Sequence, residues 1–122
     1  GRLAPTAKNL QEQKIYVIQS EENLAKLDKL TPCRYGAPTC LLVAFDKNNV
    51  FTYPGGKRDS GIEDASIVAT HMTLAAFNEG VDSCWINLFN DFFKHIFLLC
   101  LFIRKRLQKN KTSRENFQLV IF

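Results

Sequence analysis

The chain has 122 residues, enough for one domain with its own core, and its 46% hydrophobic and 23% charged residues are ordinary for a globular protein. The net charge of +4 is uneven: residues 91–122 hold seven basic and two acidic side chains, whereas residues 1–90 hold nine and ten. The basic character therefore belongs to the last quarter of the chain, and it does not indicate a nucleic-acid-binding domain.

Membrane insertion and secretion are also disfavoured by the sequence. The apolar stretch Ile96–Ile103 has eight residues, whereas a membrane-spanning helix needs about 20. No early apolar run follows a basic start, so no secretory signal is expected. Four cysteines form no C-x-x-C pair, and we predict reduced buried thiols and no metal site, as in a cytoplasmic protein: Cys33, Cys40, Cys84 and Cys100.

The first half of the chain predicts two strands and one helix. Residues 14–18 are rich in β-formers, which indicates a strand. Ser20 precedes two acids and a series of leucines at helical spacing, so a helix begins there and ends at Pro32. Residues 40–45 are continuously apolar, which predicts a strand covered on both faces.

A longer helix is predicted in the second half. Ser60 and Glu63 have capping-box spacing, the helical pattern runs from Ile62 to Asn78, and Gly80 supplies a left-handed end. Its apolar surface is wide, so the helix is either central or packed against a partner. Asp59, Glu63 and Asp64 are interpreted as charges that favour the start of the helix. Residues 83–86 predict a further buried strand.

Two separated stretches resemble a known family. Leu3–Gln11 contains the pattern P-T-x-x-N-x-Q, and Ser60–Asn87 combines an alanine-rich helix with the closing sequence C-W-I-N. Together they resemble the two flavin-cradling segments of the FMN-dependent nitroreductases, over about residues 2–90. The resemblance implies an α+β fold, a nitroreductase-like central sheet flanked by helices, here incomplete. It also implies FMN bound between the two subunits of a homodimer.

The resemblance implies cofactor-binding residues in both stretches. The first stretch would meet the pyrimidine edge of the flavin with side-chain donors and acceptors, and Lys8 would place a positive charge near the ring: Pro5, Thr6, Lys8, Asn9 and Gln11. The second would lie against the ring with its backbone, with a main-chain N–H at or near Asn87 aimed at N5: Trp85, Ile86, Asn87 and Leu88. No catalytic side chain is implied, because the flavin carries the chemistry.

The implied activity is that of an NAD(P)H oxidoreductase. The flavin would pass electrons to nitroaromatic or quinone-type acceptors by a ping-pong route. Residues 1–5 read like the end of a helix that enters a loop, so we expect that the chain begins partway through a larger fold. No residue matches the arginine-rich motif with which the family grips the FMN phosphate. We also expect impaired FMN binding, because charge-assisted contacts are worth about 1.5–3 kcal/mol each.

The composition changes after Asn90. Residues 91–122 are dominated by Phe, Leu, Ile, Lys and Asn and contain no Gly or Pro, as an out-of-frame reading of AT-rich DNA would give. We therefore expect a core fragment over residues 1–90 and a divergent, frameshifted tail over 91–122. Two alternatives stay open: a non-catalytic remnant or interaction module that pairs through helix 62–78, and a peripheral membrane-binding protein that uses segment 92–106.

Overall fold

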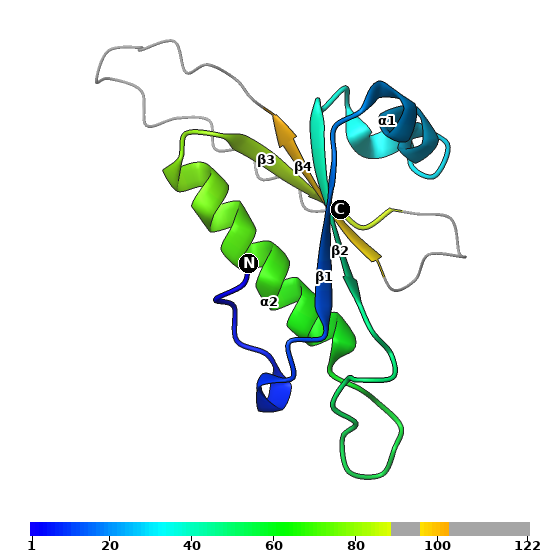
Figure 1. Ribbon diagram of the computed structural model, residues 1–122, viewed down its shortest axis with the longest axis vertical. Helices are drawn as coiled ribbons and strands as arrows, with labels where there is room; N and C mark the ends of the chain where they lie inside the picture. Colours follow the sequence, from blue (N-terminus) through cyan, green and yellow to red (C-terminus); the bar gives the residue numbers. More distant parts are fainter. Residues whose placement is uncertain (89–95, 103–122) are drawn as a thin grey trace.

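A computed structural model of the chain describes residues 1–88 and 96–102 (Figure 1). Its four-stranded antiparallel sheet has the order β1-β2-β4-β3. The strands are β1 (Gln13–Ile18), β2 (Thr39–Phe45), β3 (Asp82–Ile86) and β4 (Ile96–Phe102). The helices are α1 (Glu21–Asp28) and α2 (Gly61–Asn78), with the short 3-10 turns η1 (Ala7–Asn9) and η2 (Pro32–Arg34). The mixed α+β fold that we predicted is thus confirmed.

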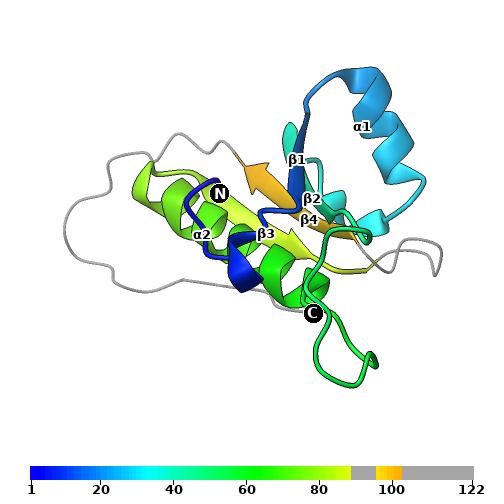
Figure 2. The same cartoon turned by 60° about the horizontal axis from the view of Figure 1, so that its bottom comes forward.

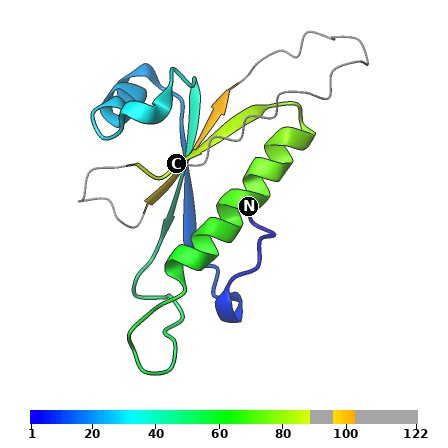
Figure 3. The same cartoon turned by 180° about the vertical axis from the view of Figure 1, so that it is seen from behind.

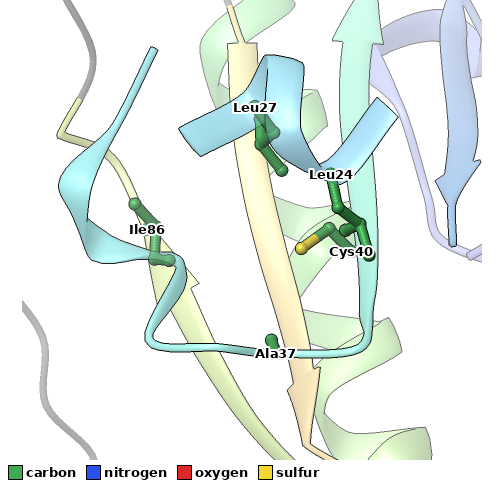
Figure 4. Packing of buried hydrophobic residues seen from close by; sticks show 5 residues of the cluster. All are labelled: Leu24, Leu27, Ala37, Cys40 and Ile86. Carbon is green, nitrogen blue, oxygen red and sulfur yellow. The ribbon is translucent and has the colours of Figure 1, made fainter. Parts of the chain in front are cut away.

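The two helices cover opposite faces of the sheet (Figure 2). Alternate residues of a strand point to opposite faces, so β2 contributes to two cores. Cys40 lies in the core under α1, together with two leucines of that helix, Ala37 and Ile86 (Figure 4). Val43 lies in the core under α2, with Ala65, Val68 and Ala69. The expectation that β2 is covered on both faces is confirmed by this arrangement.

The start of α1 follows the sequence pattern. The Ser20 side chain accepts a hydrogen bond from the Asn23 backbone N–H at 3.4 Å, as an N-cap residue does. Leu24 and Leu27 are the buried residues of this helix. Arg34 then donates to both oxygens of Asp28, from Nε and Nη2, at 2.6 Å each. The helix and the turn η2 are therefore joined by a bidentate ion pair.

The capping box predicted for α2 is wrong. The Ser60 side chain makes no capping hydrogen bond, and Asp59 Oδ1 instead accepts from the Gly61 N–H at 3.0 Å. Glu63 does not reach back to Ser60, because it accepts from the Tyr53 hydroxyl and pairs with Arg58 at 3.3 Å. The other end of the helix agrees with the sequence: Gly80 has φ +74°, and Val81 N–H donates to Ala76 O at 2.8 Å.

Part of the segment expected to be a divergent tail forms a central strand. β4 pairs with β2 on one side and with β3 on the other, so its backbone lies inside the sheet. The backbone of the apolar run Ile96–Phe102 is therefore paired within the sheet. The rest of segment 92–106 from the membrane-binding alternative, including the basic run 104–106, lies outside the described residues, and the frameshift remains a prediction.

Within residues 1–88 and 96–102, no helix is both long and apolar enough to cross a bilayer. Cys40 is buried, as predicted, but Cys33 and Cys84 are only half-buried, and the side chain of Cys100 lies outside the described residues. Burial raises the pKa of the Cys84 thiol, and the neighbouring Cys33 adds to the effect. No group of three metal-ligating side chains occurs in the described part of the chain.

Candidate functional site

The first predicted stretch forms a loop that is anchored to α2. Ala4 is buried in the same core cluster as Val68 and Ala69. Three residues on, the Ala7 N–H donates to Asp64 Oδ1 at 2.9 Å, although the two residues are 57 positions apart. Residues 5–11, called the 5–11 loop below, run beside α2 and lead into β1 (Figures 1 and 3). Both anchors lie on one helix, so the position of this loop depends on α2.

The backbone of the 5–11 loop is held in an unusual conformation. Lys8, Asn9 and Gln11 have φ of 52°, 55° and 51°, in the left-handed region that non-glycine residues seldom occupy. Two hydrogen bonds to Thr6 close the loop: its carbonyl accepts from Asn9 N–H at 2.9 Å, and its hydroxyl from Gln11 N–H at 3.0 Å. Such strain persists only where surrounding contacts fix it, and it is concentrated at functional sites.

The polar side chains of the 5–11 loop point outward. Lys8, Asn9 and Gln11 are exposed, and Gln11 Nε2 donates to Asn9 Oδ1 at 3.2 Å. The Lys8 ammonium group lies 4.7 Å from the centroid of the Phe51 ring. Pro5 is exposed and Thr6 half-buried. The loop thus presents two amides and one cation on a fixed backbone, a donor set that can bind a planar ring bearing carbonyl and ring N–H groups.

The second predicted stretch divides at the end of β3. Trp85 is half-buried against the α2-side core, whereas Ile86 is buried on the opposite face, under α1. The pairing of β3 with β4 ends at Ile86, opposite Leu98. Asn87 and Leu88 lie beyond the ladder and are exposed. Their backbone amides are therefore outside the β3–β4 pairing, as a segment that contacts a ligand with its main chain requires.

The two stretches lie at the same end of the sheet but at opposite edges. Each pair of neighbours in the order β1-β2-β4-β3 is antiparallel, so the two edge strands β1 and β3 run in opposite directions. The start of β1 and the end of β3 therefore lie at the same end of the sheet. Three inter-strand spacings separate the two edges by roughly 14 Å, and the twist of the sheet spreads them further (Figure 1). A single chain therefore does not bring the 5–11 loop and the 87–88 segment onto one edge of a ring.

Two buried carboxyl groups beneath the 5–11 loop were missed in the sequence. Glu12 and Asp64 are only 4% and 3% exposed. Burial raises the pKa of Glu12, and Asp64 raises it further by hydrogen bonding and by its charge. The backbone N–H of Glu12 itself and the Gln13 side chain act in the opposite direction. Asp64 could have been found, because its position shares the buried stripe of α2 with Ala65 and Val68; nothing in the sequence marks Glu12.

The donor set suits part of a flavin. The loop amides and Lys8 fit the pyrimidine edge, and the main chain beyond Ile86 fits a contact along the ring. Within residues 1–88 and 96–102, we identify no side chain as a ligand of the FMN phosphate. The fit is therefore to the ring and not to the whole cofactor.

Taken together, an antiparallel sheet with helices on both faces and a strained polar loop at one end define an α+β protein. The model of the Nitroreductase family matches residues 30–114. The chain belongs to the Nitroreductase family. The match continues past Asn90, where we expected the resemblance to end, and it begins after the 5–11 loop.

Solved structures support the same assignment. A nitroreductase family protein of Clostridium difficile 630 is 33% identical, with a TM-score of 0.78 over 89% of this chain and 69% of its own. A nitroreductase family protein of Clostridium novyi NT (20% identity, TM-score 0.73, 90% and 71% covered) shares the fold. A Bacillus subtilis protein described as a nitroreductase also shares the fold, with 19% identity and a TM-score of 0.67 over 99% of this chain and 82% of its own. No curated protein matches the chain.

Proposed function

We propose that the protein is an FMN-dependent oxidoreductase that takes electrons from NAD(P)H and passes them to nitroaromatic or quinone-type acceptors. Membership of the Nitroreductase family supports the class of reaction. The observation that carries the proposal is the 5–11 loop, whose three left-handed residues hold two amides and a lysine outward in one conformation. Residues held in such sparsely populated conformations cluster at functional sites.

Each part of the proposed site has a defined task. Asn9 and Gln11 would bind the pyrimidine edge through their amides, Thr6 and Pro5 would fix the loop, and Lys8 would favour negative charge on the ring. Trp85 and Ile86 would hold the end of β3 so that the main chain of Asn87 and Leu88 faces the ring. When bound, FMN supplies the redox chemistry by accepting hydride at N5, and the residues of this chain bind and orient it.

The placement of the two stretches supports a homodimer. Since one chain holds them at opposite edges of the sheet, a ring can meet both only if a second copy supplies one of them. Helix α2 offers a surface for that contact, because its outer face carries four exposed apolar side chains: Ile62, Ile67, Leu74 and Phe77. They point away from the buried stripe that contains Ala65 and Val68, so the sheet does not cover them.

The test of the cofactor is an FMN titration of the purified chain, followed by assay of NADH and NADPH oxidation with a nitroaromatic and a quinone. We expect a yellow complex of weak affinity and acceptor-dependent turnover. A chain that stays colourless at millimolar FMN would contradict the proposal. We expect Lys8→Met to weaken FMN binding, whereas Lys14→Met, a matched change at an exposed lysine of β1, should leave it unchanged.

The test of the dimer is its mass in solution. Leu74 is 64% exposed on α2, and Leu74→Glu should convert the dimer into a monomer and abolish FMN binding. Tyr35→Glu is the control, because Tyr35 is 60% exposed but lies in the turn that follows η2, away from α2. A Leu74→Glu monomer that still binds FMN would contradict the two-subunit site.

The same apolar face keeps one other function open. An interaction module that pairs through α2 without a cofactor would also be a dimer broken by Leu74→Glu. It would, however, stay colourless and show no acceptor-dependent oxidation of NAD(P)H. The combination of mass and visible spectrum therefore separates the two functions.

A further inference from the structure

We propose that Glu12 and Asp64 form a proton-sharing pair of carboxyl groups that positions the 5–11 loop for the flavin ring. The inference rests on the proposed function for its consequence in cofactor binding, but the pair itself can be tested without a cofactor. Neither residue would touch the ring, so both act as positioning residues.

The first step of the argument is the place of the pair in the chain. Glu12 lies between the 5–11 loop and β1, and its backbone carbonyl accepts from the Asp46 N–H at 3.1 Å. Asp64 lies in the first turn of α2, and its Oδ1 accepts the Ala7 N–H at 2.9 Å. The Asp64 carboxyl group therefore holds the middle of the loop, and the backbone of Glu12 holds its exit. Asp64 also raises the pKa of Glu12, so the two residues connect the loop, the start of β1 and α2.

The second step is that both groups are buried without a cation beside them and with three of their four carboxyl oxygens unpartnered among the described residues. Both are more than nine-tenths buried, and neither forms an ion pair with a lysine or arginine among the described residues. Among the described residues, no donor forms a hydrogen bond of ordinary geometry with Asp64 Oδ2 or with either carboxyl oxygen of Glu12. Two ionised carboxylates in this position would repel each other with no cation to offset them. One shared proton removes the repulsion and supplies the missing donor.

The neighbours of the pair favour the same state. Asp64 faces Glu12 from α2, and the Gln13 amide lies beside Glu12 on β1. In the loop that precedes α2, the Tyr53 hydroxyl donates to Glu63; this hydrogen bond is the main cause of the raised pKa of Tyr53, and the charge of Asp64 adds a smaller contribution. None of these neighbours is a cation. Burial and Asp64 both raise the pKa of Glu12 above its ordinary value of 4.5, in agreement with a proton kept by the pair.

The direction of the pH effect follows from linkage. A carboxyl group whose pKa is higher in the folded state stabilises that state below its ordinary pKa. The contribution is lost as the pH rises through the folded-state pKa. The anchored loop is therefore favoured at acid pH and loosens as the pair loses its proton. If the 5–11 loop binds FMN, the cofactor should bind more tightly on the acid side of this transition.

The direct test is amide hydrogen exchange of residues 4–11 in the cofactor-free protein, expressed as protection factors over a range of pH. Wild-type protection should fall as the pH rises from the ordinary pKa of Glu12, 4.5, through its higher folded-state pKa. In Glu12→Gln an amide replaces the shared proton permanently, and protection should vary less than about twofold over the same range. Glu63→Gln, at the exposed neighbour of Asp64, should follow the wild type.

Two further variants keep the test decisive. Asp64→Asn retains an acceptor for Ala7 N–H and gains a donor toward Glu12, so it should also be independent of pH. Asp64→Ala removes the acceptor and should lower protection of the loop at every pH. Identical pH profiles of loop protection for the wild type and a fully folded Glu12→Gln variant would overturn the proposal.

A parallel titration with FMN separates the two proposals. We expect the wild-type Kd for FMN to rise with pH and that of Glu12→Gln to stay level. If no variant binds FMN but the exchange profiles differ as described, the cofactor assignment fails and the carboxyl pair stands. If FMN binding and the protection of the loop each have the same pH profile in the wild type and in Glu12→Gln, the carboxyl pair fails and the cofactor assignment stands.

Discussion

The ammonium group of Lys8 lies over the ring of Phe51, with 4.7 Å between Nζ and the ring centroid. Phe51 in turn packs edge-on against Tyr53, with their centroids 5.1 Å apart. The contact links the 5–11 loop to the segment that enters α2. It also fixes the direction of the one cation that we propose to act near the flavin.

Replacing Phe51 with leucine should therefore weaken FMN binding without removing any group that touches the ring. An exposed cation–π contact is worth about 0.5–1 kcal/mol, which corresponds to a rise in Kd of about twofold to fivefold. Fluorescence titration with FMN measures the change. In the Lys8→Met background the same substitution should have no further effect, and additive losses would contradict the linkage.

Asn9 allows the backbone of the loop to be separated from its amide. Its φ of 55° is a conformation that glycine adopts freely, whereas alanine, which has a Cβ, is destabilised there by about 1 kcal/mol. Asn9→Gly and Asn9→Ala both remove the amide, but only Asn9→Ala should also lower the melting temperature. If the amide binds the ring, both variants should lose FMN affinity. Normal affinity in Asn9→Gly would mean that only the backbone conformation matters.

The start of α2 should be sensitive to Asp59 and not to Ser60. Asp59 Oδ1 caps the Gly61 N–H, and losing such a cap lowers the free energy of unfolding by about 1 kcal/mol. The Ser60 hydroxyl is buried without a partner among the described residues, so Ser60→Ala should be neutral or slightly stabilising. Urea denaturation of Asp59→Ala and Ser60→Ala makes the comparison. The reverse order would restore the capping box that the sequence suggested.

Gly61 is required by a close approach of two elements. A Cβ added at this residue would overlap the Phe45 ring at the end of β2. Gly61→Ala should therefore lower the free energy of unfolding by about 1–3 kcal/mol, although alanine is the better helix former. The double variant Gly61→Ala with Phe45→Leu should recover part of that loss. If Gly61→Ala alone is stabilising, α2 does not pack on β2 as closely as described.

Local patterns in the sequence were enough to locate most elements. The leucines after Ser20, the apolar run of β2 and the left-handed Gly80 each act over a few residues, and the structure agrees at all three. The family was also recognisable, because the P-T-x-x-N-x-Q loop and the C-W-I-N segment keep their order along the chain. The roles of those residues toward FMN remain predictions.

Long-range contacts decided the remainder. Asp59 caps α2 in place of Ser60, whose backbone is already helical, and Glu63 is engaged by Tyr53 and Arg58; the capping-box spacing records neither fact. The partnership of Glu12 with Asp64 likewise depends on how α2 lies beneath the 5–11 loop.

The sequence by itself determined the family and the main elements, because propensity, periodicity and capping depend on neighbours within a few positions. The tertiary structure alone decided that the two flavin-type stretches lie at opposite edges of one sheet, since strand order is set by pairing between residues far apart in the chain. It also decided that two acids share a buried site, because burial depends on packing between elements and not on the residue type.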